Sequence, residues 1–416
     1  MKLLLHLAAA ACVVVLDWLR GTRGEDDGPA HRPIVRFVLR HPGLVAGAVG
    51  AAAGIGGALL LVSGVVPVKA SSGHWPVTAR ILDFAKLQSV RTHSLGIEAP
   101  PLDDEALVLR GATHYETGCY PCHGKPGAAL PPVMAAMTPP PPELTGERVA
   151  RWTPEQLFSI VKHGIKFTGM PAWPAQERDD EVWAVVAFVR RLPALDAAGY
   201  DRLTQGPVPD AIGSVAGDRL EETLTVPAFV RTVCARCHGV AGNGRGPDAF
   251  PVLAGQRAAY MDATLRAFAE GSRHSGIMAP VAAGLSRDTI LEVTAYYERL
   301  PARIPDAAAA EQALARGAEI ATRGVPERDI PACVECHGPI DEPRNPAYPR
   351  LAGQHARYLR QQLTLLKERR RGGSPQVNLM YSFVDRLSAE DVGAVASYYA
   401  SLAPSAATGA SRSSLP

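Results

Sequence analysis

The sequence predicts an all-α protein in which three consecutive helical domains follow an N-terminal transmembrane helix. The motif C-x-x-C-H-G occurs three times, at intervals of roughly 100 residues, which is the sequence pattern of an internal repeat. Each copy is followed by a closing segment with helical periodicity, and a long uncharged apolar stretch precedes the first copy. At 416 residues the chain is too long for one hydrophobic core, which also indicates several domains.

The composition argues against one large class of function. Charged residues make up 20% of the chain and the net charge is only +2, whereas nucleic-acid binders carry a concentrated basic excess. Aromatic residues make up 6%, while there are 39 glycines and 36 prolines. This mixture is typical of small, loop-rich domains that need something besides side chains to fill their cores.

Two apolar segments lie near the N-terminus. Residues 43–68 contain no charged side chain and are long enough to cross a bilayer, which takes about 20 residues. Residues 3–16 are short for a span, and we interpret them as a hydrophobic segment or as the consequence of a start codon placed too far upstream. Cys12, within them, is read as an ordinary apolar cysteine. One membrane anchor is therefore expected, at 43–68.

The first repeat begins with "ALVLRGATHYETG", which reads as a helix leading into the motif "CYPCHG". Its closing helix is "DDEVWAVVAFVRRLP", expected to be capped by Asp179 or Asp180 and to stop near Pro193. Between them stand "MTPPPPEL" and "GIKFTGMPAW". The first repeat thus has the same order of opening helix, motif and closing helix as the others, but a different sequence between the motif and the closing helix.

The second and third repeats are alike well beyond their motifs, "CARCHG" and "CVECHG". "PVLAGQRAAYM" follows one and "PRLAGQHARYL" follows the other, and each repeat later reaches a methionine and a closing Tyr-Tyr helix. Ser286 and Ser388 are expected to be the N-caps of these closing helices, with Asp391 completing a capping box. These two repeats therefore form a tandem pair.

The C-x-x-C-H spacing has a direct chemical reason. Two thiols on one helical turn can bond both vinyl groups of a haem, and the next histidine then points at the iron. A four-cysteine zinc site needs two pairs about 15–20 residues apart, and a redox dithiol favours a βαβ context; neither pattern is present. We therefore predict three covalently attached haem c groups. Their attachment residues are Cys119, Cys122, Cys234, Cys237, Cys333 and Cys336, and their proximal iron ligands are His123, His238 and His337.

The sixth iron ligand is expected downstream of each motif, where a methionine raises the reduction potential. The predicted ligands are Met170, Met278 and Met380. The alternatives are favoured less, as packing or surface residues: Met134, Met137, Met261, His274 and His355. The carbonyls of Pro251 and Pro349 are placed to accept the ring N–H of the iron-bound histidine, although turn geometry alone would also explain those prolines.

With these motifs in hand, each repeat resembles a class I cytochrome c domain. Residues 218–404, with "LAGQ" and the Tyr-Tyr helix twice, resemble the tandem diheme cytochrome c4 type, and residues 100–198, with "GMPAW", resemble a monohaem cytochrome c domain. The stretch between the anchor and the first motif is similar to that of membrane-anchored bacterial cytochromes. The resemblance implies electron transfer at the inner membrane, with the haem domains on its periplasmic side.

The expected organisation follows from these units. It comprises an N-terminal segment at 1–42, the anchor at 43–68, a periplasmic linker at 69–100, a first domain at 101–198, a linker at 199–217, a second domain at 218–303, a third domain at 304–404 and a disordered tail at 405–416.

The expected function is electron transfer between redox proteins, from a quinol-oxidising complex to a terminal oxidase. Two alternatives remain: the cytochrome subunit of a membrane-bound alcohol or sugar dehydrogenase and, less favoured, a haem peroxidase. We expect no catalytic residues, no nucleic-acid partner and no small-molecule substrate, because the sequence offers no acid–base cluster and each repeat supplies a methionine for its iron.

Overall fold

The computed structural model describes residues 37, 40–66, 68–146, 148–205, 225–246, 248–301, 311–338 and 345–403. The chain divides into two compact units, residues 1–72 and residues 73–416. The described residues contain helices and no named strand, with only two isolated bridges between extended residues. The all-α prediction is therefore confirmed.

The first unit contains helix α3, Pro42–Val62, which starts with a proline at its first turn and buries none of its residues. It is the one helix in the described part of the chain that is long and apolar enough to cross a membrane. It occupies most of the predicted anchor, and the short 3₁₀ turn Ala70–Ser72 follows. The apolar segment 3–16 and the tail 405–416 lie outside the described residues.

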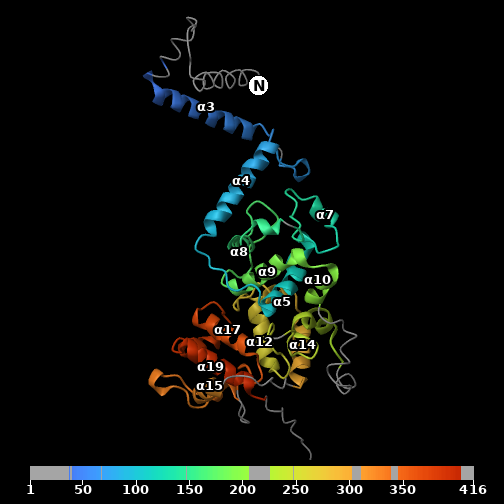
Figure 1. The fold of residues 1–416 in the computed structure, drawn as a ribbon, viewed down its shortest axis with the longest axis vertical. Coiled ribbons are helices and arrows are strands. Elements are labelled where there is room, and N and C mark those ends of the chain that lie inside the picture. Colours follow the sequence, from blue (N-terminus) through green and yellow to red (C-terminus); the bar gives the residue numbers. More distant parts are fainter. Residues whose placement is uncertain are drawn as a thin grey trace, which may run out of the picture. The chain divides into compact units, whose positions relative to one another are not determined.

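The first domain of the second unit is built on two crossing helices, α5 and α9 (Figure 1). A glycine permits the crossing, because a Cβ on Gly111 would lie 1.9 Å from the carbonyl oxygen of Ala184. Its core includes Tyr115 and Phe188, whose ring centroids are 5.3 Å apart. The helices are α4 Pro76–His93, α5 Glu105–His114, α6 Tyr120–His123, α7 Pro132–Ala135, α8 Pro154–His163, α9 Asp179–Arg191 and α10 Ala197–Thr204, with a π-helical turn at Tyr115–Cys119 and 3₁₀ turns at Val149–Arg151 and Leu192–Ala194.

One local expectation for this domain is wrong, and both expected linkers beside it contain a helix. Asp179 and Asp180 lie inside the first turn of α9; its N-cap is Arg178, which makes no side-chain cap bond. Helix α10 falls where the linker at 199–217 was expected, and its Tyr200 is fully buried in the first core, so the domain's helices run to Thr204 rather than to residue 198. Likewise α4, within the expected linker 69–100, is a helix that contacts α8.

The second domain holds α11 Ala235–His238, α12 Ala258–Ala269, α13 Met278–Ala283 and α14 Arg287–Arg299, with a π-helical turn at Val230–Cys234. Val230, Met261 and Tyr297 are in its core. The hydroxyl of Ser286 accepts the amide N–H of Thr289, so the predicted N-cap of α14 is confirmed.

The third domain holds α15 Glu311–Arg323, α16 Val334–His337, α17 Ala356–Lys367, α18 Val377–Val384 and α19 Ala389–Ser401, with a 3₁₀ turn at Pro326–Arg328. Helices α15 and α19 cross as α5 and α9 do, and α17 packs on α19 (Figure 1). At the crossing, a Cβ on Gly317 would lie 2.2 Å from the carbonyl oxygen of Ala394. The capping box of Ser388 and Asp391 is present as predicted.

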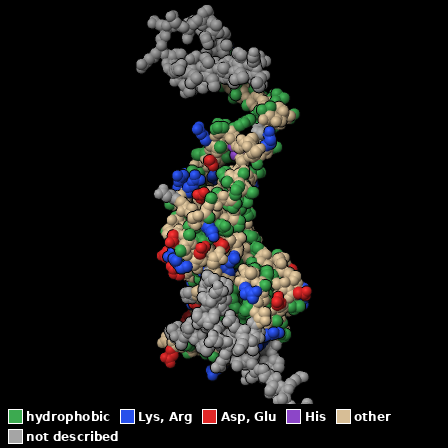
Figure 2. Space-filling model, turned by 90° about the vertical axis from the view of Figure 1, so that its right-hand side faces the viewer, with side chains coloured by type: hydrophobic (Ala, Val, Ile, Leu, Met, Phe, Trp, Pro, Cys, Tyr) green, Lys and Arg blue, Asp and Glu red, His purple; other side chains and the backbone are tan. Residues whose placement is uncertain are grey.

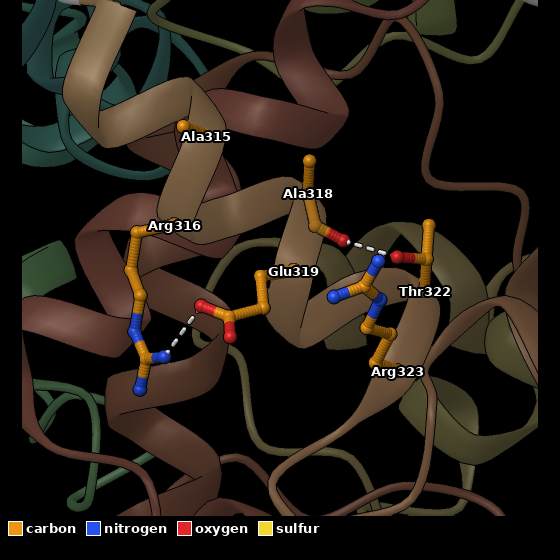
Figure 3. A pocket seen from close by; sticks show the side chains of 6 residues that line it. All are labelled: Ala315, Arg316, Ala318, Glu319, Thr322 and Arg323. Atoms are coloured by element: carbon orange, nitrogen blue, oxygen red, sulfur yellow. Dashed lines mark hydrogen bonds and ion pairs between the residues drawn. The ribbon is translucent and has the colours of Figure 1, made fainter.

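The surface of this unit is mixed in charge. Figure 2 shows Lys and Arg side chains interspersed with Asp and Glu on the face that it presents. A hollow along α15 is lined by Ala315, Arg316, Ala318, Glu319, Thr322 and Arg323 (Figure 3). None of these side chains belongs to the predicted haem-attachment motifs, and Arg316 and Glu319 pair with each other at 2.9 Å.

Candidate haem centres

Each cysteine motif occupies a single helical turn that ends at its histidine. These turns are α6, α11 and α16. The next residue is a glycine with positive φ in all three cases: 76° at Gly124, 74° at Gly239 and 72° at Gly338. Only glycine adopts that conformation without strain, which explains the last letter of C-x-x-C-H-G. The chain therefore turns away directly after each histidine.

The three histidine rings make the same hydrogen bond. Nδ1 donates to a proline carbonyl in each domain: His123 to Pro142 at 2.9 Å, His238 to Pro251 at 3.1 Å, and His337 to Pro349 at 3.0 Å. A histidine held through Nδ1 has its Nε2 free to ligate a metal, and such a bond fixes the ring and raises its basicity. The bonds predicted for Pro251 and Pro349 are confirmed. The bond from His123 to the Pro142 carbonyl was not predicted, because Pro142 lies farther along the chain from its motif, in the loop "MTPPPPEL".

The electrostatics of the motifs favour neutral ligands. Burial lowers the pKa of His123, His238 and His337, partly opposed by the bond to the proline carbonyl. Burial also raises the pKa of the Cys119 and Cys234 thiols to about 12 and that of Cys333 to about 11. A redox dithiol favours a lowered thiol pKa, whereas burial raises the pKa of these three thiols.

The cysteine pairs do not combine into a metal site. Across the described ranges, no group of three or more His, Cys, Asp or Glu side chains is arranged to hold a metal ion. Each pair instead stands with its own histidine, and two of the three histidine rings lie near an aromatic ring: Phe250 is 6.4 Å from His238, and Tyr348 is 6.3 Å from His337. Paired thiols, an oriented imidazole and an apolar wall fit covalent haem, whose iron cycles between two oxidation states when bound.

The predicted methionines lie in equivalent parts of the three domains, each between the motif and the closing helix. Met170 is in the loop after α8, where its amide N–H donates to the hydroxyl of Thr168 at 3.1 Å. Met278 is the first residue of α13, and Met380 lies within α18 against the third core. All three side chains are partly buried.

The alternative ligands have other surroundings. Met261 is buried in the second core, as the packing interpretation predicted. The Met137 side chain lies against Gly169, where an added Cβ would be 2.2 Å from its Cε. His274 donates from Nδ1 to the carbonyl of Arg370 at 3.1 Å. His355 was expected at the surface, but it is buried, with its Nδ1 2.7 Å from the Asp248 carboxylate.

The first domain also contacts the second motif directly. Leu109 of α5 packs with Ala249 and Phe250 of the second domain in one small cluster, against which Cys237 packs. The hydroxyl of Thr113 interacts with the Cys237 thiol. Residues of α5 therefore form part of the surroundings of the second motif.

The repeated "LAGQ" gives the second and third domains a symmetric contact. The amide group of Gln354 accepts the N–H of Val252 at 2.9 Å and donates to its carbonyl at 3.0 Å. Gln256 does the same to Arg350, at 2.9 and 3.0 Å. Val252 and Arg350 occupy the same place in the two repeats, directly before the leucine of LAGQ. The sequence analysis did not predict that either glutamine links the two domains. The occurrence of the same four residues, LAGQ, in both repeats could have indicated it.

Comparison with known proteins agrees with this geometry. The family model described as cytochrome c oxidase, cbb3-type, subunit III matches residues 106–189, and the cytochrome c model matches residues 227–296 and 314–403. A thiosulfate dehydrogenase electron acceptor from Stutzerimonas stutzeri is 41% identical over 172 residues, which cover 41% of this chain and 78% of the relative. Cytochrome c4 from Pseudomonas aeruginosa is 33% identical over 171 residues, or 40% of this chain and 82% of the relative.

The chain is a multihaem class I c-type cytochrome. A solved structure of cytochrome c4 from Acidithiobacillus ferrooxidans is 34% identical, covers 41% of this chain and 98% of its own, and gives a TM-score of 0.36. As a member of this family, the cytochrome binds haem c covalently and carries electrons to and from redox proteins.

Proposed function

We propose that this cytochrome is a membrane-tethered carrier with three haem c groups, which passes electrons in the periplasm from a quinol-oxidising complex to a terminal oxidase. The repeated site carries the proposal: three motifs with the same histidine–carbonyl bond and the same glycine turn, in one compact unit. Helix α3 supports the tether. The match of the first domain to an oxidase-subunit family supports the oxidase as the acceptor.

In this proposal each iron is held by a histidine and a methionine. The pairs are His123 with Met170, His238 with Met278, and His337 with Met380. The orientation of the three imidazoles supports the histidines, and the equivalent place of the methionines in the three domains supports the sixth ligands.

The haem number and the ligands are tested on the purified holoprotein. Its mass is expected to exceed that of the bare polypeptide by three haems, and replacing both cysteines of any one motif by alanine is expected to remove one. Met170→Ala, Met278→Ala and Met380→Ala are each expected to remove the methionine-to-iron charge-transfer absorption of one haem, whereas the control Met134→Ala leaves all of it. A holoprotein with fewer than three haems, or an unchanged spectrum for one of the three variants, refutes the corresponding assignment.

A second candidate function is suggested by the 41% identical relative, which is an electron acceptor of thiosulfate dehydrogenase. In that case a soluble or membrane-bound dehydrogenase, and not a quinol-oxidising complex, reduces this cytochrome. Stopped-flow reduction distinguishes the two. Rapid reduction by a quinol-oxidising complex and rapid reoxidation by a terminal oxidase support the first function. Reduction only by thiosulfate dehydrogenase with thiosulfate, or only by an alcohol or sugar dehydrogenase, supports the second.

A further inference from the structure

The closing helices of the first and third domains carry a buried carboxylate at the same position. Glu181 is the third residue of α9 and Asp391 is the third residue of α19. Each residue is only 4% exposed. Asp391 accepts the amide N–H and the hydroxyl of Ser388 and so serves its own helix as a capping box. Helix α9 has no such capping box, because its N-cap is Arg178, whose side chain makes no cap hydrogen bond.

Glu181 instead reaches into the second domain. Its Oε1 accepts the hydroxyl of Ser275 at 2.6 Å, and its Oε2 accepts the amide N–H of Gly276 at 2.7 Å. Within its own domain, Oε2 also lies 3.3 Å from the indole N–H of Trp173. Burial raises the pKa of the Glu181 carboxyl, and Arg178, 2.9 Å from Oε1, opposes this rise by pairing with the carboxylate. An ionised carboxylate is an acceptor only, so it suits a place surrounded by donors.

Both sets of donors belong to loops that carry a proposed iron ligand. Trp173 is three residues after Met170, in "GMPAW". Ser275 is three residues before Met278, and its hydroxyl oxygen accepts the amide N–H of Met278 at 3.0 Å and that of Ile277 at 3.2 Å. Because the Ser275 hydroxyl donates its hydrogen bond to Glu181, the lone pairs of its oxygen are turned toward those two amides.

The two loops also touch each other at this point. The backbone of Gly276 lies under the Trp173 indole so closely that a Cβ there would be 2.3 Å from its Nε1. The same indole ring packs in a T-shaped arrangement with His114, with ring centroids 5.6 Å apart. The carboxylate therefore stands at a tight contact between the two ligand loops and not at a solvent-filled gap.

We propose that Glu181 is a positioning residue shared by the first two haem centres: one buried carboxylate that fixes the Met170 loop through Trp173 and the Met278 loop through Ser275 and Gly276. The proposal rests on the ligand assignment under Proposed function. Loss of the carboxylate loosens both methionines at once, which lowers the fraction of each iron that is methionine-bound and shifts both reduction potentials. The third haem, whose domain uses the equivalent carboxylate as a helix cap, is not affected.

The test is spectroelectrochemistry of the full-length holoprotein with Glu181→Gln. The amide keeps the shape of the side chain but replaces one acceptor oxygen with a donor, so Ser275 and Gly276 cannot both be satisfied. Weaker methionine charge-transfer absorption and shifted potentials at two of the three haems are expected. The matched control is Asp391→Asn, which removes an equally buried carboxylate and is expected to leave the first two haems as in the wild type.

A second variant keeps the test decisive if Glu181→Gln fails to fold. Ser275→Ala removes only the hydroxyl on the second domain's side, and only the haem assigned to Met278 is expected to change. Unchanged potentials and absorption in Glu181→Gln, a change at a single haem in that variant, or no change in Ser275→Ala would overturn the proposal. Met170→Ala and Met278→Ala are recorded in parallel: if these variants keep their charge-transfer absorption, it is the ligand assignment that fails.

Discussion

Replacement of Gln354 by alanine is expected to destabilise the contact between the second and third domains. The truncation removes both interdomain hydrogen bonds, to the N–H and to the carbonyl of Val252, and also the bond that Gln354 accepts from the N–H of His355. Both backbone groups of Val252 are buried, and water does not replace the lost partner without opening the interface. Gln256, its counterpart, makes the same two bonds to Arg350, but that site is only partly buried.

The size of the effect follows from this difference. Leaving a buried donor or acceptor unpaired costs about 1–3 kcal/mol for each group. Two groups at Val252 therefore give about 3 kcal/mol for Gln354→Ala after some relaxation. Gln256→Ala is expected to cost about 1–2 kcal/mol, because water reaches its partners and the Arg350 guanidinium still donates to the Gly255 carbonyl at 2.6 Å.

Native-state hydrogen exchange measures this directly, since it reports the opening of the contact without requiring the whole chain to unfold in one step. A loss of about 3 kcal/mol corresponds to roughly 100-fold faster exchange of the Val252 amide. Gln354→Ala is expected to show that acceleration in the holoprotein, and Gln256→Ala a smaller one at Arg350. Exchange at the wild-type rate for Val252 in Gln354→Ala, or a larger effect from Gln256→Ala, refutes the reasoning.

Two further substitutions test the structure. Gly276→Ala places a Cβ 2.3 Å from the Trp173 indole and is expected to cost about 1–3 kcal/mol in thermal unfolding, whereas Gly284→Ala, whose nearest atom is 3.8 Å away, costs little; equal costs contradict the tight contact. Burial opposes ionisation of Asp391, yet bonds from Ser388, Arg328 and Arg316 lower its pKa to about 2, below the ordinary 3.8. Its stabilisation is therefore present above pH ~4 and is lost as the pH falls toward ~2. Asp391→Asn is expected to flatten the fall in melting temperature over that range, and an equally steep fall in the variant contradicts the assignment.

Local chemistry made much of this fold predictable. Cysteine spacing identified the haem motifs, and Ser286 and Ser388 identified the starts of two helices, because a motif or a cap depends on neighbours within a few residues. The acids of α9 were misread for the same reason: Asp179 and Asp180 look like caps, but they pair with Lys162, Arg370 and Arg178. Lys162 and Arg370 are distant in the sequence and leave no local pattern, whereas Arg178 lies only two residues from Asp180.

The first domain differs from the others in what the sequence reveals. Its loop supplies a histidine partner, Pro142, farther from the motif than Pro251 and Pro349 are from theirs, so comparison among the repeats did not find it. Helix α10 was read as part of a linker, yet Tyr200 fills the core and its hydroxyl donates to Glu116 at 2.5 Å. The role of Glu181 depends on loops from two domains, which only a three-dimensional structure brings together.

The contact of α5 with the second motif bears on how such chains are assembled and re-engineered. Leu109 and Thr113 belong to one repeat but border the cysteine of the next, so the repeats are not interchangeable modules joined by tethers. Exchanging the first repeat for that of another cytochrome would also replace side chains that border the second cysteine motif. Co-inheritance of neighbouring repeats, rather than free shuffling of single ones, is the evolutionary pattern that such shared contacts favour.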